Sequence, residues 1–563
     1  MSMLSSAPES LDVLEPQRGN GLQWASVAVV LLVALSVRLF QIEQQAVCDD
    51  EFYCMRFFPA ASLDGFINDI RQDSPDMPPL YFILAYGWSC VFGPSPVAMR
   101  CLAVILSLCC ACLLYVIGRR ISGHMAGLLS AFAFSLSPLH VFYGQDIRVY
   151  ALYSALGLLS MMAFLEIIRA PSRLWWVLNW LSNTLLLYTH FVSGLFIIVQ
   201  FAFLLALRPR SAKTLLLWSF SHAASALPLV PWVIALYSGH STPTSSLPPL
   251  AMVLLIFAFS EFSRCGFAEC LPSWRGCLPQ DAVSTWHVVV IASGVSLLAI
   301  HLASVARVLR LLFVHCPLGK NFGIGESTRA ARNKSMCVSP EHCGRRGLEL
   351  AFLFSWFFGP AVLLYLLAAV RLPANVLQLR YVIASQLAIY ILVGVAAAAG
   401  GTYLGRRTFS AAVVVLYIAG TFVAYAYPPR GDYFGVIRVL RKAMPPDRAV
   451  VLVSNHGDGL FRYNLGSTPL SVVSACTSED LRKDLQEQLR NYGDAWLVFE
   501  ARGNPEQEET LMAAFYSAAD EFKLNHDFQA RLGGSPGLLM CHCWLPEHPA
   551  GVRERLQQPV VGG

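Results

Sequence analysis

Charged residues are scarce in this chain. Asp, Glu, Lys and Arg make up 14% of its 563 residues, against roughly 25% in an ordinary soluble protein. So few charges cannot cover the surface of a soluble protein of this length, and 55% of the residues are hydrophobic. The net charge of +5 is small and its cations sit in short loops, so nucleic acid is not expected as a partner. The composition predicts an integral membrane protein.

A dense disulfide framework is not indicated, although the chain has 16 cysteines. Most of them lie inside apolar runs, where the thiol behaves as a small hydrophobe. The candidates for bridging fall in irregular segments: Cys48 with Cys54, and Cys265, Cys270 and Cys277. The residues before Gln23 include three acids, unlike the basic start of a cleaved signal peptide. The first apolar run is therefore expected to be a retained anchor.

Long apolar runs set the number of predicted spans, because a spanning helix needs about 20 apolar residues. The run Leu22 to Gln41 has this length, whereas Met77 to Phe92 is shorter and starts with two prolines. If the shorter run lies in the interface, every basic loop falls on the cytoplasmic side, as Lys and Arg prefer. We therefore predict an all-α polytopic membrane domain of about eleven transmembrane helices plus interfacial segments, the second of them at Leu250 to Phe262.

The same charge count predicts the sides and the domains. We predict a multi-pass protein of the cell (inner) membrane. Residues 1–21 form its cytoplasmic tail, residues 22–427 its membrane domain, and residues 428–563 an extracytoplasmic domain. Residues 42–97 become a long first external loop.

The C-terminal part has short β-branched or aromatic runs at Ala449 to Ser454 and Ala495 to Glu500, with a helical pattern from Ser478 to Tyr492 between them. We predict a small α/β soluble domain, with Ser478 as the N-cap of that helix.

Three consecutive carboxylates, Asp49, Asp50 and Glu51, follow the first span. Neighbouring side chains in a helix or strand point in different directions, so at most two of these acids can converge on one point. Such a group could supply a general base or bind a cation. The plain alternative is a solvated loop whose acids only oppose cytoplasmic retention.

Further polar residues lie at helix edges on the same predicted face. Asp146 and Arg148 lie in the segment Tyr143 to Tyr150, between two spans, where an acid and an arginine could also simply pair or snorkel. His190 and the pair Arg380-Tyr381 are placed similarly. Interfacial anchoring is the plain alternative for each of them.

Taken in chain order, these motifs resemble those of the GT-C superfamily of polytopic glycosyltransferases, particularly bacterial relatives of protein O-mannosyltransferases and of enzymes that glycosylate lipid A or lipopolysaccharide core. The matching segments are Asp50-Glu51, Pro78 to Tyr81, Gly118 to Arg120, Gly144 to Tyr150, Thr189-His190 and Arg380-Tyr381. Met77 stands where relatives commonly have histidine, so a ligand role there is lost. Asp146 replaces the usual glutamate, which keeps the charge and shortens the reach.

The resemblance implies transfer of a sugar from a polyprenyl-phosphate carrier to a hydroxyl of a lipid, glycan or protein at the outer membrane face. A lipid phosphate is a competent leaving group, so the site needs a base and cations. We expect Asp50 to be the base and the guanidinium groups of Arg148 and Arg380 to stabilise the phosphate. The remaining substrate-binding candidates are Glu51, Asp146, Tyr150, His190 and Tyr381.

In-line displacement would invert the anomeric centre. No cofactor is required, and a divalent cation is possible among the clustered acids, although no residue demands one.

Two other functions are compatible with many spans. The first is a polytopic transporter or lipid-linked sugar flippase without transferase chemistry, which would place ionisable groups or broken helices near the bilayer midplane. The second is a sensor whose C-terminal domain binds an external ligand.

Overall fold

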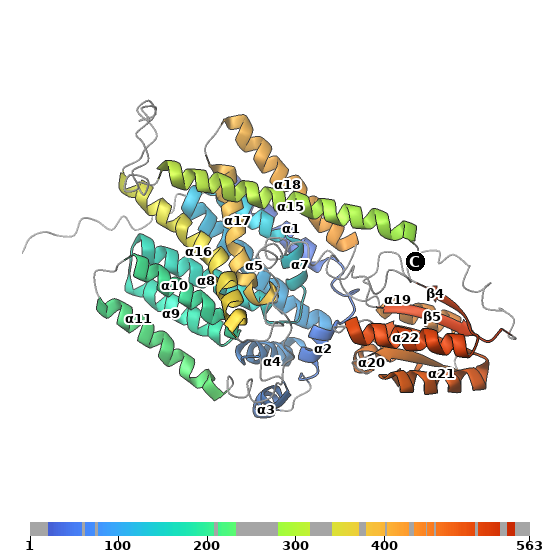
Figure 1. The fold of residues 1–563 in the computed structure, drawn as a ribbon. Coiled ribbons are helices and arrows are strands. Elements are labelled where there is room, and N and C mark those ends of the chain that lie inside the picture. Colours follow the sequence, from blue (N-terminus) through green and yellow to red (C-terminus); the bar gives the residue numbers. More distant parts are fainter. Residues whose placement is uncertain are drawn as a thin grey trace, which may run out of the picture.

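A helical body and a smaller sheet domain make up the computed structural model (Figure 1). It describes residues 21–58, 62–73, 77–207, 212–231, 280–315, 340–370, 379–399, 402–426, 433–445, 447–454, 458–500, 505–529 and 538–546. The predicted interfacial segment Leu250 to Phe262 and the cysteines Cys265, Cys270 and Cys277 lie outside these ranges.

Seven described helices are long and apolar enough to cross a membrane. These spans lie in α1 (Gly21–Leu39), α5 (Pro96–Ser122), α8 (Tyr150–Arg169), α15 (Gln280–His315), α16 (Pro340–Val370), α17 (Ile383–Ala398) together with the 3-10 turn before it, and α18 (Tyr403–Ala426). Large apolar side chains such as Leu217 and Phe422 are exposed, which suits contact with lipid rather than water. The predicted multi-span helical body is confirmed, while the count of about eleven spans stays a prediction.

The body also contains shorter helices, among them α4 (Leu80–Phe92), α6 (His124–Ser135), α7 (Pro138–Tyr143), α9 (Arg173–Leu187), α10 (Gly194–Ala206) and α11 (Ala212–Ala226). With 13 residues, α4 is roughly 20 Å long at 1.5 Å per residue, which is short of the hydrocarbon thickness of about 30 Å. The placement of this segment in the interface stays a prediction.

Helix α17 lies in the centre of the body, and every residue from Ile383 to Ala397 is buried. It can approach α6 closely because Gly394 has no side chain: a Cβ there would lie 2.2 Å from the carbonyl oxygen of Ala126. Small residues at such crossings let membrane helices pack backbone to backbone. The 3-10 turn η8 (Leu379–Val382) leads directly into α17, so the position of α17 fixes Arg380.

We expect Gly394→Ala to lower the yield of folded protein, because the added methyl group meets the backbone of α6 and overpacking costs about 1–3 kcal/mol. Gly87→Ala is the matched control, since a Cβ at Gly87 meets nothing within 4 Å. Size-exclusion profiles of detergent extracts measure the effect. Equal monodisperse yields of the two variants would contradict this packing argument.

The described C-terminal residues form a five-stranded sheet in the order β2-β1-β3-β5-β4. Its strands are β1 (Ala449–Ser454), β2 (Ser471–Ala475), β3 (Asp494–Glu500), β4 (Asn525–Gln529) and β5 (Leu538–Trp544). The first three are mutually parallel, and β5 and β4 add antiparallel. The helices are α19 (Tyr433–Ala443), α20 (Gly459–Leu465), α21 (Ser478–Tyr492) and α22 (Pro505–Glu521).

The predicted strands at 449–454 and 495–500 and the helix at 478–492 are confirmed, but the predicted N-cap is wrong by one residue. Thr477 is the N-cap, and its hydroxyl accepts a hydrogen bond from the backbone N–H of Asp480 at 3.1 Å. Ser478 already has a helical position. Both residues have a capping hydroxyl, so the sequence alone could not separate them. The predicted domain boundary near residue 428 stays a prediction.

Candidate active site

Asp50 joins two arginines that are distant in the sequence. Its Oδ1 accepts a hydrogen bond from Nη2 of Arg148 at 3.0 Å, and its Oδ2 accepts one from Nη1 of Arg380 at 2.5 Å. The Asp50 side chain is 33% exposed, whereas those of Arg148 and Arg380 are 7% and 22% exposed. The carboxylate is thus accessible while the cations behind it are largely desolvated.

Asp50 is presented by the short helix α2 (Asp49–Met55), which lies between α1 and α4 in the chain. Acids in the first turn of a helix are favoured by the positive end of its dipole. Within that turn, Glu51 Oε2 accepts a hydrogen bond from the backbone N–H of Cys48 at 3.3 Å. Because neighbouring side chains diverge on a helix, Asp50 and Glu51 face different partners.

Glu51 is fully buried against Arg100 of α5. Nε and Nη2 of Arg100 donate to the two Glu51 oxygens at 2.9 and 2.6 Å. The remaining Arg100 donors bind the backbone carbonyls that lead into α2, those of Ile42, Gln45 and Ala46. The predicted substrate-binding role of Glu51 is untested, and the contacts favour a positioning role for this residue.

The segment between α7 and α8 packs against both α1 and α2. Gly144 leaves room for the buried Arg38, because a Cβ there would lie 2.8 Å from Arg38 Nε. Gln145 Nε2 donates to the carbonyl oxygen of Arg38 at 2.7 Å. The backbone N–H of Ile147 donates to Glu51 Oε1 at 3.2 Å, so this turn and α2 fix each other in the orientation that brings Arg148 to Asp50.

The guanidinium group of Arg148 binds Asp50 on one side and contacts two sulfur atoms on the other. Its Nη1 lies 3.5 Å from Cys54 Sγ and 3.5 Å from Met77 Sδ. Burial acts to lower the pKa of Arg148, but the Asp50 carboxylate and the neighbouring Cys54 outweigh it, and the pKa lies well above the usual value. Burial in turn raises the pKa of Cys54 to about 11. The pair therefore keeps a charged arginine beside a neutral thiol.

The side chain of Arg380 extends from η8 to Asp50, and one of its N–H donors has no hydrogen-bond partner within the described residues. Its Nε is buried and has no hydrogen-bond partner within the described residues, although Nη1 binds Asp50. A buried N–H without a partner costs free energy unless a ligand satisfies it. Arg380 therefore offers an additional donor to an anion that enters beside Asp50.

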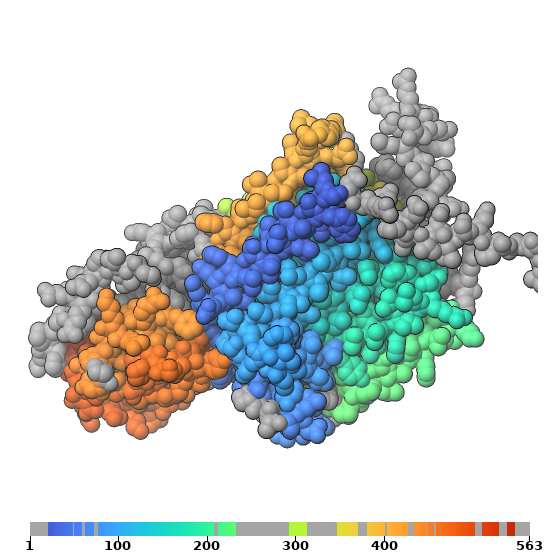
Figure 2. All heavy atoms as spheres, turned by 180° about the vertical axis from the view of Figure 1, so that it is seen from behind, coloured from blue at the N-terminus to red at the C-terminus, as the bar shows by residue number. Residues whose placement is uncertain are grey.

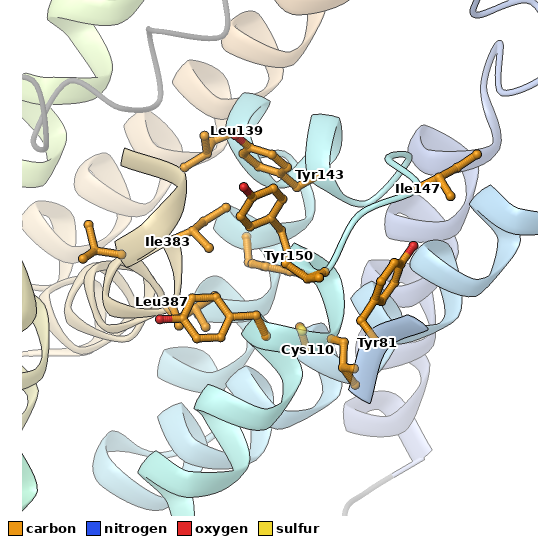
Figure 3. Packing of buried hydrophobic residues seen from close by; sticks show 14 of the residues in the cluster. Tyr81, Cys110, Leu139, Tyr143, Ile147, Tyr150, Ile383 and Leu387 are labelled. Carbon is orange, nitrogen blue, oxygen red and sulfur yellow. The ribbon is translucent and has the colours of Figure 1, made fainter. Parts of the chain in front are cut away.

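Aromatic rings gather around the two arginines. His190 stacks on Tyr153 with ring centroids 5.2 Å apart and lies 5.0 Å from the ring of Tyr381. Tyr150 packs against Tyr143 at 4.6 Å, and Figure 3 shows these two rings side by side. Burial, followed by the charges of Arg380 and Arg148, lowers the pKa of His190, so His190 is neutral at physiological pH.

The structure brings most of the predicted site residues together. Asp50, Arg148 and Arg380 form one cluster, and His190 and Tyr381 adjoin it through ring contacts. Tyr150 is buried with its ring 6.4 Å from that of His190. Asp146 is buried too, on the side of Glu51 and Cys48, away from the direct Asp50 contacts.

Sequence reasoning missed Arg38 and Arg100, which fix the framework of the site. Both are fully buried. Nε of Arg38 donates to Ser107 Oγ at 2.6 Å and Nη1 to the carbonyl oxygen of Ser135 at 3.0 Å. The available signal was an arginine within an apolar run, since ionisable residues in spans are costly and usually have a role.

One cluster has the composition of a cation site. Ligand atoms of Cys48, Glu51 and Asp146 lie within 4.8 Å of one another. Both oxygens of Glu51, however, already accept hydrogen bonds from Arg100, and a cation there would face that guanidinium. The residues therefore fit a divalent cation poorly. Cys54 is a free thiol, so the candidate disulfide between Cys48 and Cys54 is not formed.

With this geometry, the chain is a polytopic membrane protein in which one carboxylate, Asp50, is bound between two arginines. Residues 76–235 match the family model described as dolichyl-phosphate-mannose-protein mannosyltransferase. This confirms, over that part of the chain, the resemblance to GT-C membrane glycosyltransferases. The match includes Arg148 and His190, while Asp50 and Arg380 lie outside it. A search of curated proteins found no match.

Three solved structures align with most of the chain at low identity. ArnT from Cupriavidus metallidurans in the apo state has 13% identity and a TM-score of 0.38, over 92% of this chain and 98% of that one. The same protein bound to undecaprenyl phosphate has 14% identity and a TM-score of 0.38, over 92% and 97%. The Archaeoglobus fulgidus oligosaccharyltransferase tethered with an acceptor peptide has 12% identity and a TM-score of 0.46, over 91% and 73%.

Proposed function

We propose that this protein is a membrane glycosyltransferase that moves a sugar from a polyprenyl-phosphate carrier to a hydroxyl group of a lipid, glycan or protein. The observation that carries the proposal is the accessible Asp50 carboxylate bound between Arg148 and Arg380. A carboxylate can take the acceptor's proton, and two guanidinium groups suit the oxygens of a phosphate leaving group. The match to the mannosyltransferase family model supports this chemistry.

The donor phosphate changes the state of the site when it binds. Without a donor, both arginines pair with Asp50 and hold it ionised. A phosphate that takes their hydrogen bonds, together with the unpartnered Nε of Arg380, draws the cations away from Asp50. The carboxylate then loses two neutralising partners and becomes a stronger base at the moment when the leaving group is in place.

The reaction is a single displacement with inversion. The acceptor oxygen attacks the anomeric carbon while its proton passes to Asp50, and the bond from that carbon to the phosphate oxygen breaks with its electron pair on the phosphate. Retention would need a second carboxylate about 5 Å away to act as nucleophile. Glu51, the neighbouring carboxylate, is fully buried and bound to Arg100, which supports inversion.

We place the site at the outer face of the cell membrane, with the N-terminus cytoplasmic and the C-terminal domain extracytoplasmic. The basic loops support this orientation. Arg38 lies in the last turn of α1 and Arg100 near the start of α5, so the charged groups of the site gather at helix ends. A transporter would be expected to place them nearer the midplane, and this observation favours the transferase.

Membranes that contain the protein should transfer label from one member of a panel of radiolabelled polyprenyl-phosphate sugars to a lipid, glycan or protein fraction. Membranes without the protein are the control. Anomeric configuration of the product, determined by NMR, tests inversion. Transport of a lipid-linked sugar across sealed vesicles, with no new glycosidic bond from any donor, would favour the flippase instead.

We expect sugar transfer to survive removal of divalent cations. Arg100 already neutralises Glu51 in the cluster with Cys48 and Asp146, and two arginines neutralise the phosphate, so no cation is needed for either task. Transfer after EDTA treatment and gel filtration should stay within about twofold of the untreated rate, which is under 0.5 kcal/mol in the barrier. Loss of transfer that a single metal ion restores would show this expectation to be wrong.

A further inference from the structure

Helix α2, which presents Asp50, is too short to be stable by itself. It has seven residues, and isolated helices shorter than about 12 residues are marginal in water. Its order must come from what packs around it. On one side, Asp50 and Cys54 contact Arg148, and Glu51 is bound to Arg100. These contacts join α2 to the membrane body.

The C-terminal domain binds the backbone at the entry to α2. Oδ1 of Asn464, on α20, accepts a hydrogen bond from the backbone N–H of Val47 at 2.8 Å, and Nδ2 of Asn464 donates to the Val47 carbonyl oxygen at 2.9 Å. The same amide nitrogen donates to the Leu460 carbonyl oxygen at 3.0 Å. Asn464 and Val47 are both buried, so this two-point contact is shielded from competing water.

The side chains of α2 that point away from Arg148 pack on the same helix α20. The Phe52 and Tyr463 rings lie edge to face with centroids 5.7 Å apart, and the Tyr463 hydroxyl lies 3.5 Å from Met55 Sδ. Gly459 allows this approach, since a Cβ there would lie 3.3 Å from Cζ of Phe52. Figures 1 and 2 show the C-terminal domain lying against the N-terminal part of the body at this place.

We infer that the C-terminal domain is a structural part of the active site: α20 holds α2 in the orientation in which Asp50 meets Arg148 and Arg380, and Asn464 is a positioning residue. Asn464 contacts the backbone one residue before Cys48, the N-cap of α2. A rotation of the domain would therefore turn α2 and move Asp50. The catalytic part of this inference rests on the proposed transferase function, whereas the ordering of α2 does not.

Gly459→Leu tests the inference without removing a hydrogen bond. Leucine suits a helix, so α20 should persist, but its side chain meets the Phe52 ring and forces the two helices apart. We expect kcat for sugar transfer to fall at least tenfold, with KM for the donor within about twofold, because the arginines that bind phosphate belong to the membrane body. Backbone amides of α2 should exchange hydrogen for deuterium faster, as measured by mass spectrometry.

Three further variants separate positioning from general damage. Phe52→Ala in the Gly459→Leu background makes room for the leucine and should recover part of both kcat and the exchange protection of α2. Asn464→Ala, which loses both bonds to Val47, should behave like Gly459→Leu. Asn491→Ala is the matched control, an exposed asparagine of the same domain, and should leave both readouts unchanged.

Hydrogen exchange of α2 and kcat for sugar transfer test different parts of the inference. If Gly459→Leu and Asn464→Ala leave the exchange of α2 unchanged, the domain does not order α2 and the inference is wrong. If exchange rises while kcat is kept, the positioning of Asp50 by the domain is rejected. If exchange rises and the unaltered protein transfers no sugar from any donor, the proposed function fails while the ordering of α2 by the domain stands.

Discussion

Asp50→Asn should abolish nearly all sugar transfer, with kcat lowered about 10²- to 10⁴-fold, the usual contribution of a general base. Asparagine keeps the shape of the side chain, and its single amide oxygen can still accept a hydrogen bond from one of the two arginines, but its amide cannot take the acceptor's proton. The measurement is transfer from the active polyprenyl-phosphate donor at matched protein levels. Asp69→Asn is the matched control, because Asp69 is an exposed acid of the nearby helix α3 (Leu63–Asp73).

The affinity of the Asp50→Asn variant for the phosphate of the donor should not fall together with its kcat. In the unaltered protein, a phosphate competes with Asp50 for Arg148 and Arg380, both of which are bound to that carboxylate. The neutral side chain of the Asp50→Asn variant competes less strongly, so the affinity for a polyprenyl phosphate without sugar should stay equal or rise. Weaker binding by the variant would mean that Asp50 does not oppose the phosphate, and full transfer activity would remove Asp50 as the base.

The residues of the candidate cluster could be predicted because each belongs to a short polar motif at the edge of an apolar run. Asp50, Arg148 and Arg380 come from three such motifs, and one count of loop charges placed all three on the same face. Their direct pairing could not be predicted, because it depends on the rotation of α2 about its axis. That rotation is set by contacts with Arg100 and Asn464, which lie 49 and 417 residues from their partners Glu51 and Val47 in the sequence.

Prediction from the sequence was weakest where the mean hydropathy of a long run is little changed by one charged residue. Arg100 lies in an apolar run long enough to be predicted as a span from hydropathy, and its charge barely alters that score. Glu51 was accordingly interpreted with Asp50 as part of one acidic motif. The structure separates them, because adjacent positions on a helix diverge: Glu51 binds Arg100, whereas Asp50 binds Arg148 and Arg380. The same geometry turns an apparent cation cluster into a buried ion pair.

Arg100→Met should destabilise the protein more than any other substitution near the site. All five N–H donors of the Arg100 guanidinium are used, two on Glu51 and three on the carbonyl oxygens of Ile42, Gln45 and Ala46. Both charged side chains are fully buried. Removal of Arg100 leaves the Glu51 carboxylate buried without its cation, since the backbone N–H groups of Cys48 and Ile147 that still bind it carry no net charge, and the loss of one member of a buried ion pair costs about 3–5 kcal/mol. Thermal unfolding in detergent should therefore show a clearly lowered Tm.

The double variant Glu51→Gln/Arg100→Met distinguishes two causes of the lost stability. One is the unpaired Glu51 charge, and the other is the loss of the Arg100 hydrogen bonds to three backbone carbonyl oxygens. Glutamine removes the uncompensated charge, so part of the stability should return if the buried carboxylate causes most of the loss. Arg406→Met controls for the substitution itself, since Arg406 is exposed. A double variant as unstable as Arg100→Met would instead assign the cost to the three carbonyl oxygens that lead into α2. The sugar-transfer activity of the folded double variant would then show how strongly the segment 42–46, which leads into α2, influences the position of Asp50.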